Sequence, residues 1–174
     1  MLTEANYYTF KDVEKIGDAK TVEEVVEIAL EIFERMPTPI FFIMGAITSG
    51  KNSSEENKTR LRNIFSLLKK KNASAPNYLP LLTKAKKILH GESGVKAPKK
   101  NEGYVLQLRL QEDFYKPILL RMKGRIKLAL MPMWESSSNC WIIRRFALEN
   151  KIRVFLIQER SVVLAKESAE NQQK

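Results

Sequence analysis

The chain has 174 residues and carries 30 lysines and arginines against 20 aspartates and glutamates, a net charge of +10. This length suits one α/β domain with a substantial core, and the positive charge favours anionic partners such as nucleotides or nucleic acid. The single cysteine, Cys140, excludes an internal disulfide, and no apolar run is long enough to cross a bilayer. Because the N-terminus also lacks the apolar core of a signal peptide, we expect a cytoplasmic protein without a membrane partner.

The first third of the chain predicts a helix, a strand and a second helix. Thr21 and Glu24 form a capping box, and the apolar residues that follow recur at helical spacing. Residues 40–44, with the sequence IFFIM, are a short continuous apolar run that is typical of a strand buried on both faces. A polar turn and a second capping box at residues 53–56 then predict the next helix.

The middle of the chain is less regular. Residues 78–82, between prolines, predict a strand end or an extended segment, and residues 81–89 predict a helix. The aperiodic Gly-, Lys- and Pro-containing stretch 91–103 is typical of a mobile loop. Residues 104–122 predict mostly helix, with a break before Pro117.

The last third predicts two more strands that flank a helix. The strands are expected at 126–131 and 152–158, the helix at about 136–149, and a polar tail at 161–174. Helices that alternate with short apolar strands favour an open, mainly parallel, twisted sheet with helices on both faces. We therefore expect one α/β domain of Rossmann- or flavodoxin-like architecture over residues 1–160.

The stretch GAITSGKNSS, after the first predicted strand, superficially matches a phosphate-binding P-loop. Gly45, Gly50 and Lys51 have the right spacing, but Asn52 stands where a Ser or Thr hydroxyl would bind magnesium. Neither of the other two predicted strands ends in an aspartate that could hold the metal. We therefore do not interpret this stretch as the site of a triphosphatase.

The same stretch fits a ligand-binding turn at the carboxyl end of a parallel strand, where open α/β sheets bind their ligands. Gly45 has no Cβ, so a ligand can approach its backbone closely. Thr48 and Ser49 offer hydroxyl groups, and the amides that begin the next helix favour an anion. With Gly50, these residues form the first half of the expected site.

A second polar turn, MPMWESSSNC, follows the second predicted strand. Serines at the start of a helix are normally caps, but residues 136–138 supply three, more than one cap requires. If the two strands are neighbours, both turns face one pocket. Trp134 then either stacks on a base or lies in the core, and these alternatives stay open.

Three motifs give the chain a resemblance to the nucleoside 2-deoxyribosyltransferase-like superfamily, from about residue 10 to residue 157. They are GAITSG with EEN (45–50 and 55–57), EDFYKPI (112–118), and the pattern formed by Pro132, Trp134, Glu135, Ser137 and Ala147. The resemblance implies a reaction at the anomeric carbon of a deoxyribonucleoside or its phosphate. It also implies that Asp113 holds sugar hydroxyls and that a homo-oligomer completes the pocket. The alternative for the second motif is that Glu112 and Asp113 are a solvated helix face and that Phe114 and Tyr115 are packing.

The resemblance also places the family's nucleophilic glutamate six residues after the motif serine, where this chain has Ile143. An isoleucine cannot attack carbon. Cys140 is a nucleophile in principle, because a helix N-terminus lowers a thiol pKa, but a lone buried cysteine is more often inert. We therefore expect weak or absent N-glycosidic chemistry.

The expected function is the binding of a nucleoside or nucleotide, without a metal or another cofactor. One alternative is an active N-glycosyl hydrolase or deoxyribosyltransferase that uses Asp113 or Glu135 as its carboxylate. Another is a nucleic-acid-binding or interaction module that uses the positive charge and the lysines at 96–100. The residues expected to bind the ligand are Gly45, Thr48, Ser49, Gly50, Tyr115, Trp134, Ser137, Ser138 and Asn139.

Overall fold

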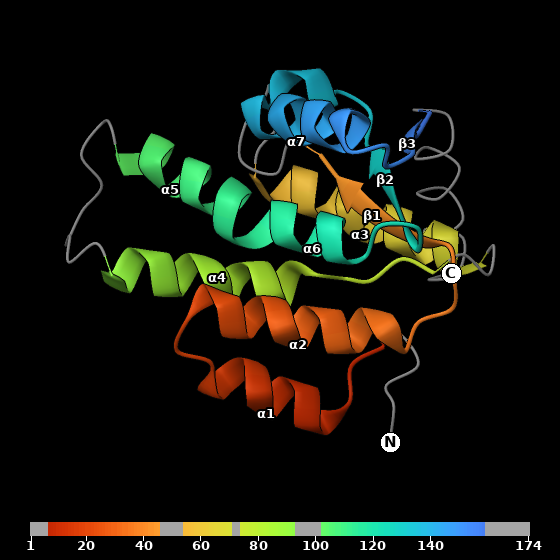
Figure 1. Ribbon diagram of the computed structural model, residues 1–174. Coiled ribbons are helices and arrows are strands. Elements are labelled where there is room, and N and C mark those ends of the chain that lie inside the picture. The colour runs from red at the N-terminus through yellow and green to blue at the C-terminus, as the bar shows by residue number, and fades with distance from the viewer. Residues whose placement is uncertain (1–6, 46–53, 71–73, 93–101, 159–174) are drawn as a thin grey trace. The chain divides into compact units, whose positions relative to one another are not determined.

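The computed structural model describes residues 7–45, 54–70, 74–92 and 102–158 (Figure 1). The chain divides into two compact units. A helical unit comprises Met1–Met36 and Asn77–Lys123, and an α/β unit comprises Pro37–Pro76 and Gly124–Lys174. The expected single domain over residues 1–160 stays a prediction. Most of the expected mobile loop, and the polar tail, lie outside the described residues.

The described part of the helical unit consists of helices that the sequence predicted only in part. They are α1 (Phe10–Asp18), α2 (Val22–Glu34), α4 (Leu79–Glu92), α5 (Glu102–Leu110), the π-helix η1 (Gln111–Tyr115) and α6 (Lys116–Arg121). The extended segment expected at residues 78–82 is wrong, because α4 begins at Leu79. Pro80 lies in its first turn, where the missing N–H has no helical partner to lose. The break expected before Pro117 takes the form of η1, since proline cannot donate to the preceding turn.

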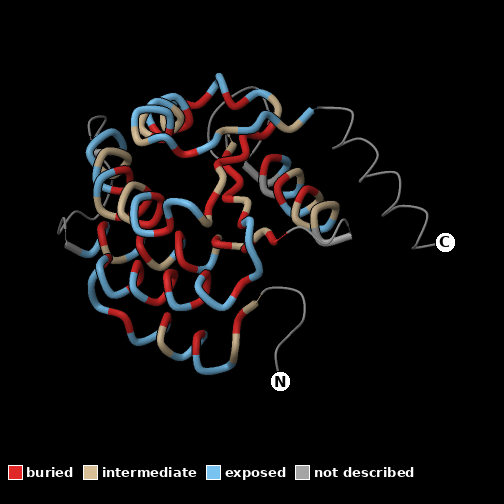
Figure 2. Tube along the Cα trace, turned by 45° about the vertical axis from the view of Figure 1, so that its right-hand side comes forward, coloured by how far each residue is buried: buried red, intermediate tan, exposed pale blue. Residues whose placement is uncertain are grey.

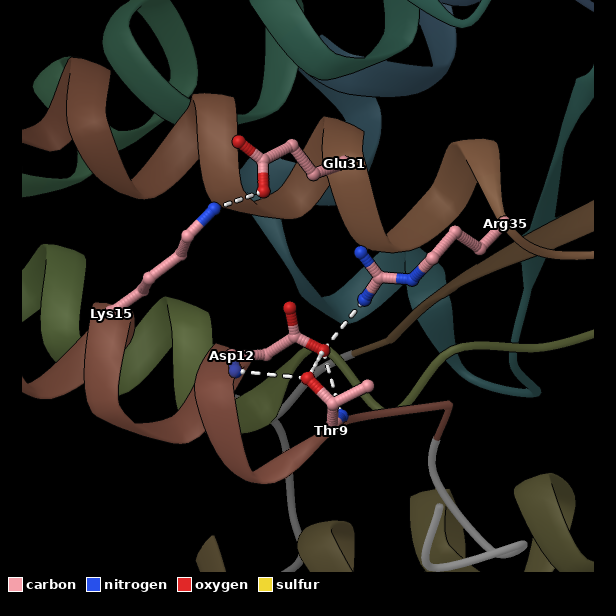
Figure 3. A network of polar contacts seen from close by, with 5 residues as sticks. All are labelled: Thr9, Asp12, Lys15, Glu31 and Arg35. Carbon is pink, nitrogen blue, oxygen red and sulfur yellow. Dashed lines mark hydrogen bonds and ion pairs between the residues drawn. The ribbon is translucent and has the colours of Figure 1, made fainter. Parts of the chain in front are cut away.

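Two threonine caps begin the first two helices of this unit, and a buried carboxylate links them. The Thr9 hydroxyl accepts from the Asp12 amide at 3.1 Å, while the Thr9 amide donates to Asp12 Oδ2 at 2.7 Å. Arg35, just after α2, donates to the same Oδ2 at 2.6 Å, as Figure 3 shows. Asp12 is only 3% exposed. Its carboxylate therefore caps α1 and pairs with α2 at once.

The α/β unit is built on a three-stranded parallel sheet, as the sequence predicted. Its described elements are β1 (Ile40–Met44), α3 (Ser54–Lys70), β2 (Ile126–Leu130), the 3-10 turn η2 (Trp134–Ser136), α7 (Ser138–Glu149) and β3 (Val154–Leu156). The strands lie in the order β1-β2-β3. Figures 1 and 2 show α7 on one face of this sheet and α3 on the other.

Burial follows the apolar pattern of the strands. Both β1 and β2 are buried on both faces, with consecutive buried residues at 42–44 and 128–130. β3 is shorter than expected, and its Phe155 and Leu156 are exposed. Figure 2 shows the buried strands at the centre of the unit. The carboxyl ends of β1 and β2 are thus fixed by a well-packed core.

Candidate functional site

The carboxyl ends of β1 and β2 lie side by side, as the ligand-binding hypothesis requires. Met44 and Leu130 are register partners in the parallel ladder. The ladder continues one step further, because the Met131 amide donates to the Met44 carbonyl at 2.8 Å. The turns that leave the two strands therefore start next to each other, at Gly45 and Met131.

The space beside Gly45 is filled by protein. A Cβ built on Gly45 would lie 2.7 Å from the sulfur of Met131 and 2.9 Å from its Cβ. Both distances are far below ordinary van der Waals contact. Glycine at this position therefore leaves room for the Met131 side chain to pack against the backbone. From the sequence, we expected a ligand in this space.

We predict that Gly45→Ala destabilises the protein by about 1–3 kcal/mol, because the new methyl group overpacks the contact with Met131. Urea denaturation measures this change. Gly103→Ala is the control, since nothing lies within 4 Å of its Cβ position and alanine favours its helix α5. Gly45→Ala should cost less in a Met131→Ala background than in wild type, because alanine removes the Met131 sulfur and Cγ from the contact. If Gly45→Ala alone leaves the free energy of unfolding unchanged, the close contact is not present in solution.

The turn after β2 is held by its own polar groups. Met133 has a left-handed backbone (φ 63°), and the Ser136 hydroxyl donates to the Met133 carbonyl at 2.8 Å. Ser137 occupies the N-cap position of α7 but makes no side-chain capping bond. Ser138 is exposed and Asn139 is half-buried. The turn therefore presents small polar side chains at the start of a 12-residue helix.

Trp134 packs against α7. Its side chain is buried, its ring lies 4.8 Å from the ring of Trp141, and the Arg144 guanidinium lies 5.3 Å from its ring centre. Of the two alternatives left open, this placement favours a structural role. A contact between Trp134 and a base stays a prediction.

Ile143, where the resemblance places a nucleophile, lies inside the core. Ile143 and Cys140 both have an exposed fraction of 0%. Burial, the main cause, and the nearby Glu135 raise the pKa of the Cys140 thiol to about 11, against a smaller opposing effect of the Ser137 hydrogen bond. The expectation that the helix N-terminus lowers this pKa is therefore wrong. Glu135 itself is exposed on η2, and its main-chain carbonyl accepts from the Trp141 indole at 2.9 Å.

We predict that Cys140 in the native protein reacts with iodoacetamide at pH 8 more than about a hundredfold more slowly than an unperturbed thiol. A pKa of about 11 leaves roughly one thiol in a thousand ionised at this pH. The urea-unfolded chain serves as the control and should react at the ordinary rate. Because Cys140 is the single cysteine, mass spectrometry reports it without ambiguity. Equal rates in the native and unfolded states would contradict this prediction.

Two of the expected site residues belong to the helical unit. Asp113 pairs with Arg109 at 3.2 Å and lines a cleft of about 470 Å³ between α2 and the α5–η1–α6 helix. Glu27, Glu112 and Arg121 are among the other charged residues of this cleft. Tyr115 is buried and packs edge-on against Tyr78 and Phe114. The cleft combines acceptors and donors that suit sugar hydroxyls, whereas Tyr115 has the contacts of a core residue.

The remaining expected residues, Thr48, Ser49 and Gly50, lie outside the described residues. In the parts of the chain that the structure describes, no group of three potential metal ligands occurs. No helix there is both long and apolar enough to cross a membrane.

Comparisons with known proteins give no relative. No family model, no curated protein and no solved structure matches the chain. The resemblance to the nucleoside deoxyribosyltransferase-like superfamily therefore stays a prediction from the three motifs alone.

The sequence reasoning did not single out two residues that shape this edge, Met131 and Trp141. Met131 could not be foreseen, because its contact with Gly45 depends on strand register. Trp141 left a signal, since it follows Trp134 by seven residues and precedes two arginines.

Proposed function

We propose that the protein binds a nucleoside or nucleotide at the carboxyl edge of β1 and β2, in a fold of the nucleoside deoxyribosyltransferase-like type. The adjacent ends of the two parallel strands carry this proposal, because open parallel sheets bind ligands at this edge. The amides at the start of α7 favour an anionic group such as a phosphate. Ser138 and Asn139 add small polar side chains there. A homo-oligomer is part of the proposal by resemblance only.

We further propose that α7 contributes no nucleophile. Ile143 has no reactive group and is fully buried, and the Cys140 thiol is protonated at neutral pH. Binding and glycosidic chemistry are therefore separate questions in this protein. Retention of the turn and loss of the nucleophile together favour a binding function.

One observation favours a second candidate, an N-glycosyl hydrolase or transferase that uses Glu135. This carboxylate is exposed and lies directly before α7. A carboxylate at the edge of a nucleoside site could attack the anomeric carbon or activate a water molecule. Only the second candidate releases free base, so one experiment separates the two.

The experiment combines thermal unfolding with chromatography of free base, using the four deoxynucleosides and their 5′-monophosphates. Deoxyribose 5-phosphate and inorganic phosphate control for general anion binding. We expect at least one nucleoside or nucleotide to raise the free energy of unfolding, by about 2.7 kcal/mol at a hundredfold excess over Kd. Free base should stay at the blank level for wild type and for Glu135→Gln. Base release that Glu135→Gln abolishes would establish the second candidate, and no stabilisation by any of these ligands would refute both.

A further inference from the structure

The positive charge of the chain is concentrated in one of its two units. The α/β unit holds 16 lysines and arginines against 7 aspartates and glutamates, a net charge of +9. The helical unit holds 14 against 13. Within the described residues of the α/β unit the counts are 11 and 4. This unit is therefore the part of the protein that attracts a polyanion.

A large aromatic side chain lies exposed on the same unit. Trp141, in the first turn of α7, has an exposed fraction of 49%. Its indole N–H already donates to the Glu135 carbonyl at 2.9 Å, and its ring contacts Trp134. The ring is therefore held in one orientation while half of its surface stays open. The Trp141 side chain would therefore lose little additional entropy when a base stacks on it.

Arginines lie near this ring on α7 and at the turn that precedes α7. Arg145 lies one helical turn beyond Trp141, and its side chain is 83% exposed and pairs with Glu149 at 2.8 Å. Arg144 lies over the neighbouring Trp134 ring. On α3, the Arg60 guanidinium donates to the Met133 sulfur at 3.7 Å, at the turn that leads into α7. Guanidinium groups beside an exposed aromatic ring are the pattern of surfaces that bind unpaired bases and their phosphates.

We infer that the Trp141 face, comprising Met133, Trp141, Arg144 and Arg145, binds single-stranded nucleic acid, with Arg60 at its edge beside Met133. A base stacks on the open side of the Trp141 ring, and the arginines contact the flanking phosphates. A duplex fits less well, because its base faces are already stacked. This inference goes beyond the proposed function, since it needs neither the turn after β1 nor a mononucleotide site.

The test is fluorescence anisotropy with a labelled 12-residue oligothymidylate at 50 mM salt and above. Wild type should bind, and the logarithm of its affinity should fall linearly with the logarithm of salt concentration. Trp141→Phe should retain most of the affinity, because a ring remains for stacking. Trp141→Leu should lose roughly tenfold or more, the range for one stacked base. Both variants lose the indole hydrogen bond to Glu135, so their difference isolates the aromatic ring.

Tyr104→Ala is the matched control, because Tyr104 is an aromatic residue, 65% exposed, on α5 of the nearly neutral helical unit. We expect no change in oligonucleotide affinity for this variant, and circular dichroism checks that every variant is folded. Three results would overturn the inference: no binding by wild type, equal affinities of Trp141→Leu and wild type, or an equal loss in Tyr104→Ala. The second result is the one expected if Trp141 instead serves as an apolar contact for a protein or a lipid. Mononucleotide binding is measured separately, so the two proposals can fail independently.

Discussion

Replacing Ile143 with glutamate should destabilise the α/β unit by at least about 3 kcal/mol, because it places an unpaired carboxylate in the core. The side chain of Ile143 is fully buried on α7, and the buried side-chain polar atoms of the described residues already have hydrogen-bond partners. We also expect no release of base from any nucleoside, although this substitution puts a glutamate where the resemblance places the nucleophile. Urea denaturation and chromatography of free base are the two measurements.

The controls separate charge from shape. Ile143→Val should cost only about 0.5–1.5 kcal/mol. Ile143→Gln matches glutamate in size without the charge. Burial raises the pKa of a carboxyl group, so the penalty specific to glutamate should grow as the pH rises above about 4.3 and shrink below it. A stable Ile143→Glu variant that releases base would show that this position faces a ligand and that our placement of it is wrong.

Asp12→Ala should destabilise the helical unit by roughly 2–3 kcal/mol, because it removes a helix cap and a charge-assisted hydrogen bond together. Asp12 Oδ2 accepts from the Thr9 amide, the Thr9 hydroxyl and the Arg35 guanidinium. Lys15→Ala is the matched control, since Lys15 pairs with Glu31 between the same two helices at a much more exposed position (Figure 3). We expect it to cost less than about 1 kcal/mol. Equal losses for the two variants would contradict the structural role of Asp12.

The same carboxylate should make stability depend on pH. Burial pushes the pKa of Asp12 up, but the hydrogen bonds from Thr9 and the charge and hydrogen bond of Arg35 together hold it below its usual value. A lowered pKa in the folded state stabilises the protein above the unfolded-state pKa, near 4. This contribution is lost as the pH falls through the lower, folded-state pKa. The difference in unfolding free energy between wild type and Asp12→Asn should therefore shrink below about pH 4.

The sequence predicted those features of the fold that depend on local pattern. The capping box at Thr21 and the continuous apolar runs at 40–44 and 126–131 located α2, β1 and β2. The alternation of helices and strands predicted a parallel sheet, whose strand order comes from the structure. The start of α4 was missed, because prolines on both sides of Tyr78 suggested an extended chain. A proline in the first turn of a helix, such as Pro80 in α4, cannot be told from a proline in an extended segment by the local sequence alone.

For the candidate site, the sequence predicted which turns follow the strands but not how the side chains of those turns pack. Serines and a glycine after two apolar runs indicated two polar turns that would meet if their strands were neighbours. The ladder between Met44 and Leu130 shows that the strands are neighbours. What occupies the space between the turns depends on side-chain packing, which spacing does not encode. Met131 beside Gly45, Trp141 beside Trp134 and the burial of Ile143 all belong to this second kind of information.

The most direct test of nucleotide binding at the carboxyl edge of β1 and β2 is an NMR titration of the 15N-labelled protein with deoxynucleoside 5′-monophosphates. The proposal predicts that the largest saturable shifts of backbone amides occur at Gly45 and in the segment 133–140. Inorganic phosphate at the same concentration should not reproduce them. Absent shifts, or shifts that are largest in the cleft beside Asp113, would contradict the proposed location of the site.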